Sequence, residues 1–185
     1  ILFLMFAVTS GGRTLLAEEQ MGTLPRLVIT PSRSITILVG KMAGIMLTGL
    51  LQVIVLWGAT SLIGAYWGPP LSVSIAIILL VLSATGVGAM ISAWAKSAGQ
   101  AGAIGTAFTL IAAAASGSFF PRMNLPAFLQ NISLITPNAW GIEIFAELQG
   151  GGDLQDILPM LGGLSVLTIA YYTIAAFGFR RRNDR

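Results

Sequence analysis

Seven carboxylates and ten basic side chains are the charged groups available for chemistry in this chain of 185 residues, which contains neither histidine nor cysteine. The lack of these two residue types removes thiol chemistry and the usual zinc sites, and no nucleophile–base pair is visible. Gly40-Lys41 is followed by Met42, so the sequence also lacks the G-x-x-x-x-G-K-[ST] loop that holds nucleotide phosphates. We therefore expect no catalytic residue, bound cofactor or metal here, and we expect the charged groups to contact partner molecules.

The elements that must position these charges are strongly apolar. The chain is 55% hydrophobic and 9% charged, whereas soluble domains average about 25% charged residues. The 54 residues between Lys41 and Lys96 carry no formal charge and are interrupted by Trp67-Gly68-Pro69-Pro70. Each half is long enough to cross a bilayer as a helix. The lipid bilayer is therefore a predicted partner, and nucleic acid is not, because no basic stripe with interleaved aromatics is present.

The predicted fold class is all-α: a polytopic membrane helical bundle with five visible spans, the first of them partial. The four complete spans are predicted at 42–64, 74–95, 98–120 and 157–179. Each gives roughly 33–35 Å of helix, enough to cross a hydrocarbon core of about 30 Å with some tilt. Residues 1–10 are interpreted as the end of a span that begins upstream; a short buried anchor at a true N-terminus is the alternative.

The connections between these spans alternate in charge. Nine of the ten basic residues lie in the loop 9–41, at Lys96 or in the C-terminal tail, whereas segment 121–156 holds Arg122 with four acidic residues. The positive-inside rule makes the basic side, including the C-terminus, cytoplasmic and the acidic segment external. No charged residue lies in the middle of a span, which counts against a secondary carrier driven by buried titratable groups.

Residues 12–41 form a longer connection than a simple bundle needs. The stretch 14–21 can form a helix that ends at Gly22, Pro25 suits the first turn of a new helix, and Thr30-Pro31 breaks the chain again. The pattern predicts a short amphipathic helix at the cytoplasmic membrane surface. This segment resembles the E-x-x-G-T-x-x-R-L-x-x-T-P…G-K signature of ABC-2 type transporter permeases. The matching residues are Glu19, Gly22, Thr23, Leu24, Arg26, Leu27, Thr30, Pro31, Gly40 and Lys41.

A second organised connection runs from Gly117 to Leu148. Pro126 and Pro137 can each open a helix too short to span the membrane, and each helix has one apolar face. Such helices lie in the outer interface or dip in and return, provided their backbone ends are shielded by protein. This segment resembles the same family, in which a pair of external re-entrant helices precedes the last span. The matching residues are Gly117, Pro121, Leu125, Pro126, Leu129, Ile132, Ser133, Leu134 and Pro137.

The resemblance covers nearly the whole chain and implies a single ABC-2 transmembrane domain, truncated at its N-terminus, in a protein of six spans. In this family the segment after the second span couples the permease to a separate subunit that binds ATP and Mg²⁺. The coupling contacts implied here are Glu18, Glu19, Gly22, Thr23, Arg26, Thr30 and Pro31. A second permease copy, or a related permease, is the other implied partner, and a prokaryotic plasma membrane is the implied location. Pro25 departs from the family pattern, in which many relatives carry an acidic residue.

Several of these residues have a second interpretation. Glu18 and Glu19 contact the ATPase or form a solvated face, and Arg26 pairs with that partner or with lipid phosphate. Glu143 and Glu147, one turn apart, guard an exit path for a cationic substrate or form a wet helix face.

Two further questions stay open at the level of the sequence. Gln52 lines a translocation path or bonds to a neighbouring helix. For the chain as a whole, an exporter permease coupled to ATP hydrolysis is the predicted function, and a non-transporting anchor or scaffold subunit is the alternative.

Overall fold

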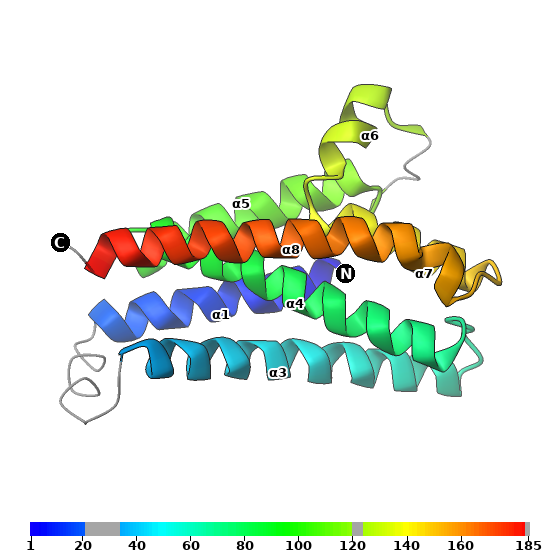
Figure 1. Cartoon of the computed structure of the whole chain (residues 1–185), viewed down its shortest axis with the longest axis horizontal. Coiled ribbons are helices and arrows are strands. Elements are labelled where there is room, and N and C mark those ends of the chain that lie inside the picture. Colours follow the sequence, from blue (N-terminus) through cyan, green and yellow to red (C-terminus); the bar gives the residue numbers. More distant parts are fainter. Residues whose placement is uncertain (21–33, 120–123, 184–185) are drawn as a thin grey trace.

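The computed structural model describes residues 1–20, 34–119 and 124–183 and is a bundle of helices arranged roughly side by side, with no strand in these ranges (Figure 1). The helices are α1 (Leu2–Gln20), α3 (Ser34–Leu62), α4 (Pro70–Trp94), α5 (Ala98–Ser116), α6 (Ala127–Ser133), α7 (Pro137–Gln149) and α8 (Leu154–Asn183). Within these helices four stretches are long and apolar enough to cross a membrane: Val39–Leu62, Pro70–Trp94, Ala98–Ser116 and Leu154–Arg181. The prediction of a polytopic helical bundle is therefore confirmed.

The helix boundaries differ from the predicted ones at several places; α4 begins at Pro70 and not at residue 74, and the apolar stretch of α3 covers 39–62 and not 42–64. α1 continues through Gly11 to Gln20, so the predicted partial span 1–10 and the helix over 14–21 are one helix, whose apolar part is Leu2–Gly11. α5 ends at Ser116, because Gly117 has a φ of 93° and its N–H bonds to the carbonyl of Ala113. A left-handed glycine of this kind terminates a helix, so the predicted span 98–120 is too long. α8 begins earlier than predicted, at Leu154.

α4 lies at the centre of the bundle, where α1, α3, α7 and α8 pack against it. Small residues allow the close approaches: a Cβ on Gly88 of α4 would lie 3.1 Å from the carbonyl oxygen of Val8 in α1, and one on Gly105 of α5 would lie 3.1 Å from Thr9. These two glycines therefore serve packing within the subunit. By contrast, a Cβ on Gly40 or Gly44 of α3 would meet nothing within 4 Å. α3 is the most exposed of the four spanning helices.

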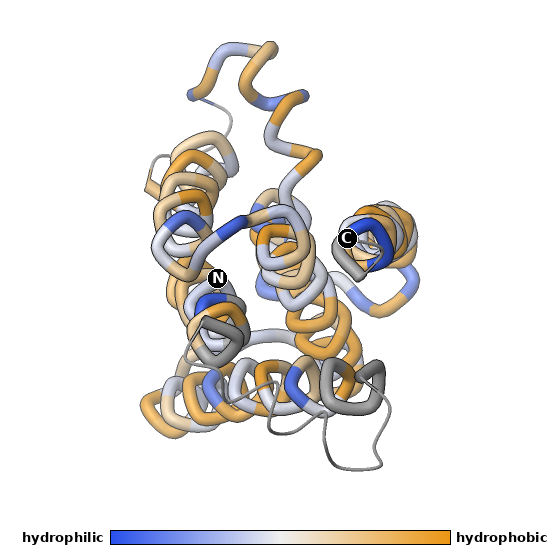
Figure 2. Tube along the Cα trace, turned by 90° about the vertical axis from the view of Figure 1, so that its left-hand side faces the viewer, coloured by the Kyte–Doolittle hydropathy of each residue, from blue (hydrophilic) through white to orange (hydrophobic). Residues whose placement is uncertain are grey.

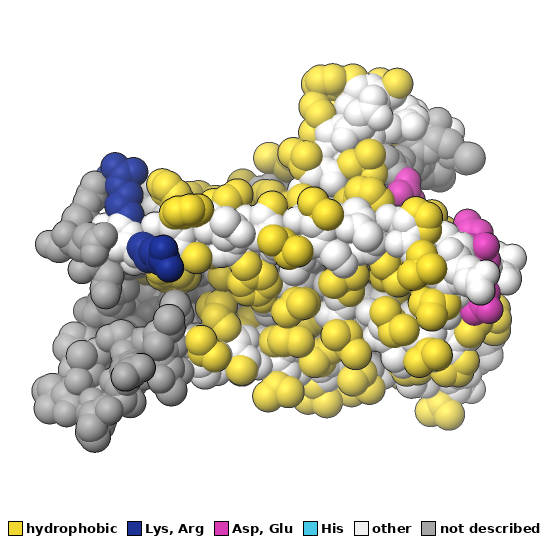
Figure 3. All heavy atoms as spheres, in the orientation of Figure 1, with side chains coloured by type: hydrophobic (Ala, Val, Ile, Leu, Met, Phe, Trp, Pro, Cys, Tyr) yellow, Lys and Arg dark blue, Asp and Glu magenta, His cyan; other side chains and the backbone are white. Residues whose placement is uncertain are grey.

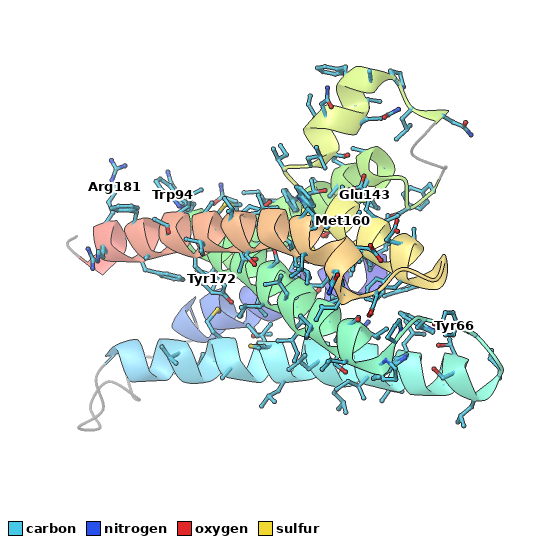
Figure 4. All side chains as sticks on the ribbon, turned by 45° about the vertical axis from the view of Figure 1, so that its right-hand side comes forward. Tyr66, Trp94, Glu143, Met160, Tyr172 and Arg181 are labelled. Carbon is cyan, nitrogen blue, oxygen red and sulfur yellow. The ribbon has the colours of Figure 1, made fainter. Side chains whose placement is uncertain are left out.

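A polar contact joins α4 to α8 between the buried Thr85 and the partly buried Tyr172. The hydroxyls of Thr85 and Tyr172 lie 2.8 Å apart; Tyr172 is labelled in Figure 4. Gly86, the next residue of α4, lies against Tyr171 and Tyr172, so the two helices are close at this level. Hydrogen bonds between membrane helices average about 0.6 kcal/mol and reach about 1.7 kcal/mol.

We expect Thr85→Val and Tyr172→Phe each to lower the unfolding free energy in detergent, and the double variant to lose less than the sum. The expected coupling energy is about 0.6 kcal/mol, because both substitutions remove the same hydrogen bond. Thr173→Val is the control, since the Thr173 hydroxyl is exposed and donates within its own helix to the carbonyl of Ile169. Strictly additive effects of Thr85→Val and Tyr172→Phe on the unfolding free energy would show that the hydrogen bond between the two hydroxyls contributes no stability.

Candidate functional site

In the described part of the chain, the charged side chains visible on the face drawn in Figure 3 lie toward the two ends of the bundle, with a broad apolar surface between them. At one end α1 finishes, α3 begins, α4 turns into α5, and α8 ends with Arg180 and Arg181 (Figure 1). We call this the basic end. At the opposite end, the acidic end, lie the α3–α4 turn and the α7–α8 turn, which holds Asp153. An apolar band between polar ends is the pattern that a bilayer imposes on a spanning bundle.

The predicted coupling residues belong to the connection between α1 and α3 at the basic end. Glu18 and Glu19 lie in the last turn of α1. Gly22, Thr23, Arg26, Thr30 and Pro31 lie outside the described residues, so the predicted short helix is neither supported nor contradicted. Just inside this end, α1 and α3 border a cavity of about 270 Å³ whose lining includes Thr14 and Lys41.

The predicted external segment contains two short helices with different surroundings. Pro137 is the first residue of α7, and Pro126 immediately precedes α6, so both prolines open helices as predicted. Pro121 lies outside the described residues. α7 is packed against α4, α5 and α8, whereas α6 contacts α5 and projects from the bundle (Figure 2).

The start of α7 is fixed by bonds to its neighbours. The Tyr171 hydroxyl of α8 donates to the carbonyl of Ile135, and the Trp140 indole N–H donates to the carbonyl of Leu134 at 2.7 Å. These bonds shield the backbone just before α7, as a short helix entering apolar surroundings requires.

The two glutamates of α7 have unequal exposure. Glu143 is partly buried (Figure 4) and Glu147 is exposed beside the α7–α8 turn, where its carbonyl accepts the N–H of Gly152. Both lie on the part of α7 that leads to the acidic end. The role of an exit guard stays a prediction.

Gln52 is partly buried and lines a cavity of about 350 Å³ between α1, α3, α4 and α7. The wall is mostly apolar, and Gln149 of α7 is the second amide on it. Trp67 and Phe145 also line the cavity and stack edge to face, with ring centroids 5.3 Å apart. The Trp67 indole N–H donates to Thr60 at 2.9 Å, which fixes the ring. An apolar cavity with a few placed polar groups is the usual form of a small-molecule site.

Buried polar groups in the interior were not anticipated from the sequence. The Ser83 and Thr109 hydroxyls and the Asn138 amide are fully buried and lack a hydrogen-bond partner in the described part of the chain. Asn138 lies in the first turn of α7, whose N-cap residue Thr136 makes no side-chain capping bond. The sequence offers little signal for these groups, because serine and threonine are common in membrane helices and usually bond within their own helix. In the described ranges, no group of three or more metal-ligating residues is present.

These features define a class: a polytopic α-helical membrane protein with four apolar helices long enough to span a membrane and two short helices before the last of them. Residues 1–150 match the family model described as ABC-2 type transporter, and the chain belongs to this family. The predicted resemblance is thereby confirmed.

Two curated relatives are permeases. The chain is 30% identical over 178 residues to the linearmycin resistance permease protein LnrN of Bacillus subtilis (strain 168), covering 95% of this chain and 46% of that protein. It is 25% identical over 188 residues to the inner membrane transport permease YhhJ of Escherichia coli (strain K12), covering 96% of this chain and 48% of that protein. The chain thus spans about half the length of the curated relatives it matches.

Proposed function

We propose that this chain is part of the permease subunit of an ATP-binding cassette transporter that exports its substrate across a prokaryotic plasma membrane. The family match over residues 1–150 carries this proposal. The charge separation supports an orientation with the basic end and the C-terminus in the cytoplasm, because basic residues are retained on that side of a membrane. ATP and Mg²⁺ bind to a separate ATPase subunit, and a second permease completes the pathway.

Coupling in this proposal runs through the connection between α1 and α3. The ATPase docks against Glu18, Glu19 and the residues that follow them up to Pro31, and closure of the ATPase pair on ATP pushes this connection. α1 ends and α3 begins at this connection, so a push at the basic end is delivered directly to the two helices that border both the basic-end cavity and the Gln52 cavity. Because packed helices shift as rigid bodies, the push changes which side of the membrane reaches the Gln52 cavity. ATP must bind one arrangement better than the other.

The absence of cysteine allows a test that needs no known substrate. We expect Gln52→Cys to react with a water-soluble maleimide, and the reaction rate to change when MgATP is added to membranes that contain the ATPase. Ile54→Cys is the control: Ile54 lies about 200° further around α3 and is half exposed on its outer face, so its reaction should not depend on ATP. Labelling of Gln52→Cys that is insensitive to MgATP would favour the anchor or scaffold alternative.

A further inference from the structure

A groove on the outer face of the bundle, between α4 and α8, belongs to neither of the cavities described above. Its volume is about 610 Å³. Leu82 contributes from α4, and Ile169, Tyr172, Thr173 and Phe177 contribute from α8. Ile169 and Phe177 are each more than half exposed, so the groove is open on the surface of the described bundle.

The groove has the length of one leaflet. Ile169, Thr173 and Phe177 recur every fourth residue along α8, and Arg180 closes the series at the basic end. From Ile169 to Arg180 the helix rises about 16 Å at 1.5 Å per residue. A hydrocarbon core of about 30 Å leaves about 15 Å for each leaflet. The stripe therefore runs from the headgroup level of the leaflet at the basic end to the middle of the membrane.

The chemistry of the lining fits a hydrocarbon chain. The hydroxyls in the groove already have partners: Thr168 donates to the carbonyl of Leu164 at 2.7 Å, Thr173 donates to the carbonyl of Ile169 at 2.7 Å, and Tyr172 bonds Thr85. A polar solute would find few free groups there, whereas an acyl chain needs none. The exposed Arg180 supplies a positive charge only at the mouth, where an arginine can bind a phosphate oxygen.

We propose that this groove binds one anionic phospholipid of the leaflet at the basic end, with an acyl chain along α8 and the phosphate on Arg180. The charge at one end and the apolar length behind it are complementary to the two parts of such a lipid. This site requires the bundle to stand in a membrane, but it does not depend on coupling to ATP.

The test measures lipid retention by native mass spectrometry, with the purified protein in detergent and either phosphatidylglycerol or phosphatidylcholine added. We expect preferential retention of phosphatidylglycerol, and we expect Arg180→Gln to weaken that retention about fivefold, the effect of one basic residue near an anionic surface. Arg181→Gln is the matched control, because Arg181 is exposed on the next position of α8 and does not line the groove. It should have little effect.

A second variant separates the groove from general surface charge. Thr173→Trp places a large side chain in the apolar part of the groove without changing any charge. It should abolish lipid retention, while its unfolding temperature stays equal to that of Arg181→Gln. Equal losses from Arg180→Gln and Arg181→Gln would overturn the proposal, since they would indicate an unspecific basic surface. Equal retention of the two lipids, or full retention by Thr173→Trp, would overturn it as well.

Discussion

Gly163→Ala is expected to lower the unfolding free energy of the bundle by about 1–3 kcal/mol, the cost of overpacking a closely packed contact. A Cβ at Gly163 of α8 would overlap the six-membered ring of Trp140 in α7. That ring cannot easily move aside, because the indole N–H at its other end donates to the carbonyl of Leu134 at 2.7 Å. The substitution therefore forces α7 and α8 apart at the point where α7 enters the bundle. Thermal unfolding in detergent measures the effect.

The neighbouring glycine provides the control for this prediction. A Cβ at Gly162 would meet nothing within 4 Å, so Gly162→Ala should be neutral or stabilising, as alanine is a better helix former than glycine. Trp140→Phe shortens the opposing ring and should recover part of the stability lost in Gly163→Ala. Equal unfolding temperatures for the two alanine variants would contradict this packing of α7 against α8.

The spanning helices and the charge separation were predictable because they follow from the solvent. A helix in hydrocarbon must be apolar over about 20 residues, and the hydropathy of each residue can be judged from the sequence alone. The cap at Gly117 shows that hydropathy alone does not predict where a helix ends. Its hydropathy does not separate it from Ser116, and only the observed left-handed φ identifies it as the end of α5.

The features that depend on neighbouring helices were not predictable. Gly11 and Gly12 favour a break in an isolated helix, yet α1 continues through them because it is packed against α3, α4 and α5. The burial of α7 depends on α4, α5 and α8, and so does the burial of Asn138. Gln52 left two interpretations open in the sequence; the structure places it on a cavity wall, and its role in a translocation path stays a prediction.

Replacing residues 18–30 by a glycine–serine linker of equal length is the second prediction with a large expected effect. The linker keeps α1 connected to α3 but removes Glu18, Glu19, Arg26 and the intervening motif residues. We expect association with the ATPase subunit to be lost, while size-exclusion behaviour in detergent is retained, because the packed core of α1 ends with the buried Leu16, before the replaced segment. The charge reversal Glu18→Lys with Glu19→Lys should weaken the association. Glu147→Lys, at the opposite end of the bundle, should not.

The most direct measurement is the molar ratio of P-loop ATPase to permease after affinity purification of the tagged protein from its own membranes. We predict stoichiometric ATPase with the unaltered protein and with Glu147→Lys, and none with the glycine–serine linker variant. A permease that purifies intact without any ATPase, or a linker variant that retains the full ratio, would contradict the proposed coupling of this bundle to ATP hydrolysis through residues 18–31.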